Sequence, residues 1–301
     1  MTPRGGTLLA SAATAAVRDG AWELAEQASR RAGVEITTPA DLDELQRAAD
    51  LWQSVWSREG EPLVPAEILR ALTHAGNYLG VARVDGRVAG ALLGFFGAHE
   101  EDGTAAVDRL HSHILGVDPR DRSRGVGFAL KLHQRAWALQ RGLRLMNWTY
   151  DPLVRRNGHF NLVKLGAAGV DYLVDFYRPM PDAINGGDHS DRILVEWDLT
   201  AVSLDDLPVA AGVDEWLRRG AVIALEAAAD GRPARRGAAE DARAVLCATP
   251  PDIVELRRTD LAGAHEWRMA LRETLLAAFA DGMRLVAMAR GGWYVLVRDA
   301  G

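Results

Sequence analysis

The sequence predicts an α/β fold of the α+β kind: a mixed, mostly antiparallel central sheet flanked by helices. Three observations carry this prediction. Asp85-Gly86 separates two apolar runs, which is typical of a β-hairpin. An Arg/Gly turn at 122–127 joins a strand to a long helical pattern, and alternating strand and helix patterns follow it. We also expect an N-terminal helical extension and a small C-terminal α/β segment.

The composition limits the classes of function. The chain has 301 residues, a formal net charge of -6 and a pI near 5.8, so a general nucleic-acid or anionic-membrane surface is disfavoured. Cys247 is the only cysteine, and no Cys/His cluster has zinc-ligand spacing, so we predict neither a disulfide nor a metal. A reducing cytoplasm fits this composition.

Residues 1–32 are predicted as the helical extension. Residues 6–32 have the pattern of one or two amphipathic helices, interrupted at Asp19-Gly20. The apolar patch from Leu8 to Val17 is shorter than the ~20 residues of a membrane span. Charged residues then follow in helical continuity, so we expect neither a signal peptide nor a membrane anchor.

Residues 33–200 are predicted as the catalytic domain. A short strand at 34–37 leads into a helix that runs to about Trp56, with Thr38 as its expected cap and Pro39 in its first turn. A second helix is predicted near 65–74.

The next part of this domain reads as an antiparallel meander. Strands are expected at 78–84, 88–96 and 106–117. The order then changes to strand-helix-strand, which makes the predicted sheet mixed. The remaining elements are a helix at 125–141, a strand at 143–149, a short helix at 157–165, and strands near 171–177 and 192–199.

The last hundred residues are predicted to form two segments. Residues 201–241 read as a helix through Ala227-Ala228-Ala229 followed by a linker. Residues 242–301 read as an α/β subdomain, with a strand at 243–248, a helix at 260–280 and two strands around Gly291-Gly292. These strands could instead extend the main sheet.

The Arg122-Ser123-Arg124-Gly125-Val126-Gly127 turn is predicted to bind an anion. It lies between a strand and a helix, so unpaired N–H groups and the positive end of the helix dipole would point at one place. A dinucleotide-binding fold is disfavoured because this turn does not follow the first strand of a βαβ unit. A P-loop is excluded because Gly-Lys-Ser/Thr is missing.

Arg122-x-x-Gly125-x-Gly127, after the strand that ends Leu115-Gly116-Val117, resembles the coenzyme A signature of the GNAT superfamily of N-acetyltransferases. Trp148 to Leu153, Phe160-Asn161-Leu162 and Ser190-Asp191-Arg192 resemble a bacterial branch of predicted GNAT acetyltransferases with a C-terminal extension. The resemblance implies acetyl-CoA as co-substrate and backbone amides of the fourth strand near the thioester. The cofactor-binding residues that it implies are Leu115, Gly116, Val117, Arg122, Ser123, Arg124, Gly125, Val126, Gly127, Phe128, Asn157, Asn161 and Lys164.

Two histidines are the candidate general bases. His113 is our first expectation and His111 the second, since residues two apart on a strand share a face, with Ser112 opposite. Either imidazole could accept an amine proton near neutral pH. A structural histidine pair remains the alternative.

The general acid is less defined. The tyrosine that GNAT enzymes often place four residues before the glycine ending the fourth helix would fall at Leu162, so it is absent. Tyr150, Tyr177 and Asn161 are the substitutes that the expected fold suggests, and water or the ammonium product could also protonate the thiolate.

These features predict an acyl-CoA-dependent N-acyltransferase, with acetyl-CoA as donor and the amine of a small molecule or amino acid as acceptor. We expect no nucleic-acid or membrane partner and leave open a homodimer. Two alternatives stay open: a non-catalytic acyl-CoA-binding or regulatory module, and a transferase that uses a carrier-bound donor.

Overall fold

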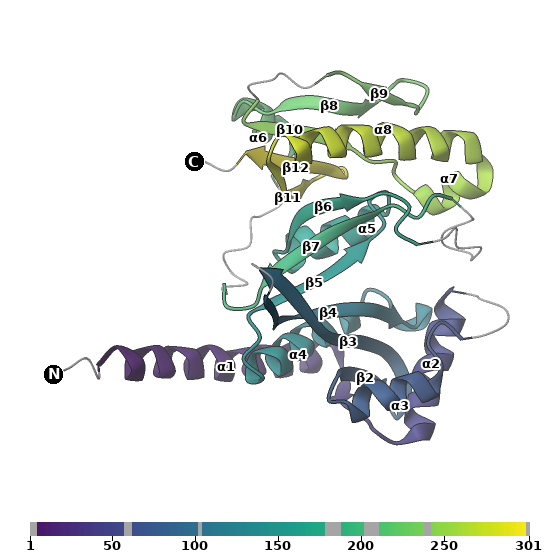
Figure 1. Cartoon of the computed structure of the whole chain (residues 1–301). Coiled ribbons are helices and arrows are strands. Elements are labelled where there is room, and N and C mark those ends of the chain that lie inside the picture. Colours follow the sequence, from purple (N-terminus) through teal and green to yellow (C-terminus); the bar gives the residue numbers. More distant parts are fainter. Residues whose placement is uncertain are drawn as a thin grey trace. The chain divides into compact units, whose positions relative to one another are not determined.

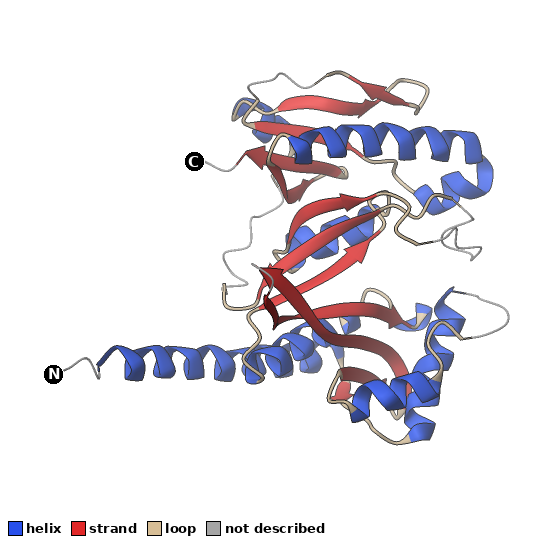
Figure 2. Cartoon of the chain, viewed as in Figure 1, coloured by secondary structure: helices blue, strands red, loops and turns tan. Residues whose placement is uncertain are grey.

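The computed structural model describes residues 5–56, 62–101, 104–177, 188–201, 211–237 and 242–298 (Figure 1). The chain divides into unit 1, residues 1–147 with 198–201, and unit 2, residues 148–197 with 202–301. Helices flank largely antiparallel strands, so the predicted fold class is confirmed (Figure 2). The unit limits differ from the predicted domain limits, and the domain division stays a prediction.

The strands of unit 1 lie in the order β1-β2-β3-β4-β5. Neighbours are antiparallel except β4 and β5, which are parallel. Asp85 (φ 49°) and Gly86 (φ 80°) form the predicted hairpin turn between β2 and β3. The strands are β1 Glu35–Thr37, β2 Tyr78–Val84, β3 Arg87–Glu101, β4 Thr104–Val117 and β5 Leu145–Tyr150.

Two pairs of helices accompany this sheet. α2 (Leu42–Trp56) and α3 (Ala66–His74) pack on one face, where the buried Trp52 donates from Nε1 to the Ala91 carbonyl at 3.1 Å. α4 (Val126–Gln140) packs on the other face, and α1 (Gly5–Ala32) runs beside α4 (Figure 1). Alternation along β3 explains both contacts, since adjacent side chains point to opposite faces.

The structure resolves two local predictions in unit 1. Of the one or two helices predicted for residues 6–32, α1 is one continuous helix, and the predicted interruption at Asp19-Gly20 is wrong, because packing along α4 outweighs the low helix propensity of one glycine. The cap of α2 is Asp41 rather than Thr38, and α2 begins three residues after Pro39. Asp41 Oδ1 accepts from the Asp43 and Glu44 N–H groups at 3.0 and 3.3 Å.

The strands of unit 2 lie in the order β5-β7-β6-β11-β12-β10-β8-β9. β6–β7 and β10–β12 are antiparallel, whereas β10 and β8 are parallel. The further strands are β6 Ala168–Leu173, β7 Arg192–Asp198, β8 Val222–Ala227, β9 Pro233–Arg235, β10 Ala244–Ala248, β11 Met283–Ala289 and β12 Trp293–Arg298. The helical elements are α5 Arg155–Gly158, the π-helical turn η2 His159–Lys164, α6 Val213–Arg218, α7 Ile253–Thr259 and α8 Leu261–Ala280.

The prediction of a helix through Ala227-Ala228-Ala229 is wrong. Ala227 ends β8, and a turn with Gly231 at φ 80° leads into β9. Pairing of β8 with β10 overrides the helix propensity of alanine here. The open alternative for residues 242–301 is also decided: β11 pairs with β6 through Leu285 and Gly169, so these strands extend the sheet of unit 2.

Candidate functional site

Two aspartates hold the Arg/Gly turn before α4. The short helix η1 (Pro119–Asp121) begins after Asp118, which accepts from the Arg120 N–H at 2.9 Å. Asp121 is buried and forms ion pairs with Arg87 at 2.7 Å and with Arg124 at 3.1 Å. Ion pairs within the turn and with β3 therefore fix its backbone.

The backbone of this turn leaves the start of α4 open. Ser123 and Gly125 have φ values of 71° and 91°, a region in which glycine is favoured. No side chain caps α4, and within the described chain the N–H groups of Val126 and Gly127 have no acceptor. The first helical bond is donated by Ala129 to the Gly125 carbonyl, at 3.0 Å. Such a helix start is suited to an anion.

The end of β4 packs tightly against both helix layers. A Cβ on Gly116 would lie 2.5 Å from the Trp52 ring, so only glycine fits there. A Cβ on Gly127 would lie 3.5 Å from Leu115 and 3.6 Å from Val117, which places the first turn of α4 against this strand. The turn and the strand end thus form one rigid corner.

β4 is paired on both edges only at one end. Its pairing with β5 covers Arg109 to His111, whereas pairing with β3 continues to Val117. From Ser112 to Val117, the described residues supply no strand partner for the second edge. This is the geometry that the resemblance implies for Leu115, Gly116 and Val117; their contact with a cofactor stays a prediction.

A β-bulge at His113 was not foreseen. Leu93 pairs with Ile114 and Gly94 with Ser112, so His113 has no partner across the strand pair. A single sequence does not indicate where a strand contains the extra residue of a β-bulge. The bulge lies where pairing of β4 with β5 has ended.

His111 and His113 share one face of the sheet, as predicted. Phe95 lies with them, its ring centroid 5.1 Å from that of His111 and 5.5 Å from that of His113. His111 is half-buried, and its Nδ1 lies 2.9 Å from Asn147 Oδ1 on β5. His113 is exposed, and within the described chain no hydrogen bond holds its ring.

Both imidazoles favour the neutral form. Burial lowers the pKa of His111, the Asn147 contact opposes this, and Lys131 adds a smaller decrease. Although His113 is exposed as a residue, partial desolvation of its ring lowers the pKa of His113, and the neighbouring His111 adds a smaller decrease. Both side chains are therefore able to accept a proton at neutral pH.

Ser112 points to the opposite face and joins a buried polar cluster. Lys131 Nζ donates to Ser112 Oγ at 2.9 Å, and Ser112 Oγ donates to Gln134 Oε1 at 2.7 Å. All three side chains are buried, and burial lowers the pKa of Lys131. Lys131 is therefore engaged inside the unit rather than exposed to solvent.

The candidate acid residues belong to unit 2. Tyr150 is buried, and burial raises the pKa of its hydroxyl. Tyr177 is half-buried, and its ring lies 4.7 Å from Phe176 and 5.4 Å from the Arg192 guanidinium. Leu162, at the position of the missing tyrosine, is fully buried. The acid assignment stays a prediction.

The predicted cofactor residues of unit 2 differ in exposure. Asn161 is buried, and its Oδ1 accepts from Trp148 Nε1 at 3.1 Å, so this side chain is engaged inside the unit. Asn157 is half-buried at the end of α5, and Lys164 is exposed. Contacts of Asn157 and Lys164 with a cofactor stay predictions.

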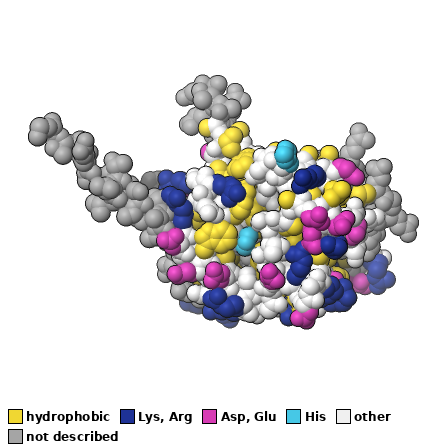
Figure 3. Space-filling model, turned by 90° about the horizontal axis from the view of Figure 1, so that it is seen from below, with side chains coloured by type: hydrophobic (Ala, Val, Ile, Leu, Met, Phe, Trp, Pro, Cys, Tyr) yellow, Lys and Arg dark blue, Asp and Glu magenta, His cyan; other side chains and the backbone are white. Residues whose placement is uncertain are grey.

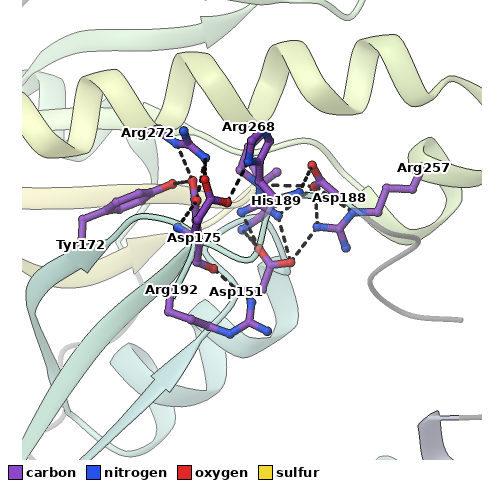
Figure 4. Close-up of polar contacts among 11 residues, drawn as sticks. Asp151, Tyr172, Asp175, Asp188, His189, Arg192, Arg257, Arg268 and Arg272 are labelled. Atoms are coloured by element: carbon purple, nitrogen blue, oxygen red, sulfur yellow. Dashed lines mark hydrogen bonds and ion pairs between the residues drawn. The ribbon is translucent and has the colours of Figure 1, made fainter. Parts of the chain in front are cut away.

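A closed ring of two aspartates and two arginines lies in unit 2 (Figure 4). Asp151 pairs with Arg268 at 2.9 Å and with Arg257 at 2.7 Å, and Asp188 lies 3.0 Å from both guanidinium groups. All four side chains are buried. Although burial acts in the opposite direction, the two arginines hold the pKa of Asp151 far below its usual range.

Asp191 extends this ion-pair network. It accepts from Arg272 Nη2 at 2.7 Å and from the Tyr172 hydroxyl at 2.7 Å (Figure 4). The arginines come from α7 and α8, whereas Asp151 and Asp191 lie next to β5 and β7. The network was missed because its arginines are about a hundred residues from Asp151. Asp151 and Asp191 thus form structural ion pairs.

Three other properties concern the described residues alone. No helix there is long and apolar enough to cross a bilayer. No group of three or more His, Cys, Asp or Glu side chains has the arrangement of a metal site. On the face shown in Figure 3, basic and acidic side chains are interspersed rather than gathered into a basic surface.

Residues 15–152 match the model of the acetyltransferase (GNAT) domain, a span that includes the turn, the bulge and both histidines. This span of the chain is an acetyltransferase (GNAT) domain. No curated protein matches the chain at a significant level.

Several solved structures resemble parts of this GNAT chain. The ribosomal-protein-S18-alanine N-acetyltransferase from Escherichia coli is 15% identical, with 56% of this chain and 96% of that chain covered at a TM-score of 0.43. An N-acetyltransferase from Staphylococcus aureus Mu50 is 14% identical, with 55% and 98% covered and a TM-score of 0.43. A GNAT acetyltransferase from Streptococcus pneumoniae is 15% identical, with 54% and 98% covered and a TM-score of 0.43.

Proposed function

We propose that this GNAT protein transfers the acetyl group of acetyl-CoA directly to the amine of a small molecule or an amino acid. The observation that carries the proposal is the open helix start at Val126 and Gly127, behind a turn fixed by Asp118 and Asp121. It is a rigid binding place for the coenzyme A pyrophosphate. A cytoplasmic location and a homodimer stay predictions.

The donor end is assigned to the turn and to the unpaired edge of β4. Within the Arg122–Phe128 segment, the N–H groups of Arg122 and Arg124 already donate to the Pro119 and Asp121 carbonyls, so the open N–H groups of Val126 and Gly127 hold the pyrophosphate. The exposed Arg122 side chain adds a charge-assisted contact. The N–H groups at Leu115, Gly116 and Val117 polarise the thioester carbonyl, which stabilises the tetrahedral oxyanion.

The acceptor end is assigned to the face of His111 and His113. The amine nitrogen attacks the thioester carbonyl carbon, a C–N bond forms, and the C–S bond breaks. A neutral imidazole accepts the proton that the amine loses. The CoA thiolate leaves and takes a proton from water, and the imidazolium returns its proton to the solvent, so that the step yields one amide and one CoA thiol.

Release of free CoA thiol from acetyl-CoA in the presence of a panel of amines tests the activity. Amine-dependent thiol release together with an acetylated product supports direct transfer. Coenzyme A binding without thiol release would favour a binding module. Acyl transfer that does not depend on free CoA would favour a carrier-bound donor.

A matched pair of variants tests whether the Arg/Gly turn at 122–127 binds the pyrophosphate. Asp and Asn tolerate positive φ and are similar in size, so Gly125→Asp and Gly125→Asn share any backbone strain and differ in charge. We expect calorimetry to show CoA binding at least ~10-fold weaker in Gly125→Asp than in Gly125→Asn, because one like charge costs about 1.4 kcal/mol or more. Equal affinities would contradict a pyrophosphate at this turn.

A further inference from the structure

Asn147 is a half-buried polar residue of β5, on the less buried of the two faces of that strand, and the sequence motifs gave it no role. It lies directly opposite His111 in the parallel pairing of β4 with β5. Its Oδ1 lies 2.9 Å from His111 Nδ1. Both residues belong to unit 1, so the contact is a property of that unit alone.

The chemistry of this contact selects one form of the imidazole. An amide oxygen only accepts hydrogen bonds, so the ring nitrogen that faces it carries the proton. In neutral His111 the proton then lies on Nδ1, and Nε2 carries the free lone pair. Within the described chain, no hydrogen-bond donor engages Nε2.

His113 has no such partner. It lies on the bulge, it is exposed, and its ring contacts among the described residues are with Phe95 and His111, with centroids 5.5 and 6.0 Å away. No hydrogen bond within the described residues selects one tautomer of this ring. The better oriented base of the pair is therefore His111, which reverses the order expected from the sequence.

We propose that Asn147 is a positioning residue that fixes His111 as the Nδ1–H tautomer and thereby makes His111 Nε2 the general base. The inference rests on the proposed acetyl transfer. The titratable groups that act on His111 are His113 on the same face and, from the opposite face of the sheet, Lys131 of α4, while β3 presents the uncharged Phe95. Lys131 donates to Ser112 on the opposite face, and His113 meets His111 ring to ring, with centroids 6.0 Å apart.

Two substitutions of Asn147 have opposite expected effects on the acidic limb of the pH–rate profile. Asn147→Asp keeps an acceptor and adds a negative charge that favours protonated His111, so the limb moves up by about one pH unit. Asn147→Leu removes the acceptor, so the limb moves to lower pH, and kcat falls about tenfold as the tautomer and ring orientation are lost.

Asn77 is the structural control. Its side chain also bonds within unit 1, since Oδ1 accepts from the Phe96 N–H at 2.9 Å and Nδ2 donates to the Leu72 carbonyl at 3.1 Å. Asn77→Leu is expected to lower thermal stability and to leave the position of the acidic limb unchanged. A merely structural role for Asn147 would give this same result.

Nitrogen-15 NMR of the histidine rings tests the tautomer without any assay of activity. We expect the His111 signals, assigned by their loss in His111→Gln, to show a protonated Nδ1 in the wild type and a mixture in Asn147→Leu. A wild-type Nε2–H tautomer, or no change in Asn147→Leu, would overturn the proposal even if thiol release is normal. A protonated Nδ1 without thiol release with any amine would instead overturn the acetyl transfer on which the base role rests.

Discussion

The polar face of β4 in unit 1 and the ion-pair ring in unit 2 are both rich in ionisable side chains, but they differ in how completely these are paired. In the ring, Asp151 and Asp188 are buried and each contacts two arginines. On β4, only one nitrogen of His111 is bonded, and His113 is exposed.

This difference separates a structural role from a chemical one. A buried charge is tolerated when ion pairs and hydrogen bonds compensate the cost of removing it from water. In this ring the carboxylates and guanidinium groups bind one another rather than a substrate. A reacting group needs a free lone pair or donor, which His111 Nε2 and the open start of α4 provide. A choice of active site by the density of charged side chains would instead have selected Asp151 and Arg268.

Removing His111 tests the chemical side of the comparison and has the largest expected effect. We expect His111→Gln to lower kcat for amine-dependent thiol release by about 10²- to 10⁴-fold, with CoA binding retained, because the base is lost while the donor site is intact. His113→Gln is expected to lower kcat less. If His113→Gln had the larger effect, the assignment of the base would be reversed.

Removing one arginine tests whether the ion-pair ring stabilises unit 2. Arg268→Met leaves Asp151 and Asp188 with Arg257 alone, so we expect a loss of about 3–5 kcal/mol in the free energy of unfolding, measured with urea. Arg258→Met, which removes an exposed pair with Glu255, is the control and should unfold like the wild type. Equal stability of the two variants would show that the ring does not hold unit 2 together.

His133 is a histidine of unit 1 that, unlike His111 and His113, packs against other side chains in a structural role. Its Nδ1 lies 2.9 Å from the Tyr78 hydroxyl, its ring meets Trp22, and burial lowers its pKa from 6.5 to about 4. The unfolded state therefore binds more protons than the folded state between these values, and stability falls as the pH falls through them.

The expected contribution of His133 is about 2 kcal/mol of stability lost between pH 7 and pH 5. Urea unfolding at the two pH values measures it. His133→Gln should be less stable at pH 7 and should lose about 2 kcal/mol less on acidification. A pH dependence equal to that of the wild type would mean that His133 is solvated in the folded protein.

Local patterns predicted much of this fold. β2, α3 and the Asp85-Gly86 turn lie where apolar periodicity and turn chemistry placed them. Tertiary contacts decided the rest: strand pairing made Ala227 the end of β8, and packing against α4 kept α1 continuous. A single sequence does not report such contacts.

The candidate site was predicted to a similar extent. The turn and the shared face of the two histidines follow from glycine spacing and strand alternation. The bulge at His113 and the contact of Asn147 with His111 depend on the register of β4 with β3 and β5. In the sequence, the contact of Asn147 with His111 is indicated only by the polar Asn147 between Met146 and Trp148.

Calorimetry with coenzyme A and with pantetheine, which lacks the pyrophosphate and the nucleotide, tests the central claim most directly. If the open start of α4 holds the pyrophosphate, CoA binds at least ~100-fold more tightly than pantetheine, since several charge-assisted hydrogen bonds are lost together. Equal affinities, or no heat of binding with CoA, would contradict the account.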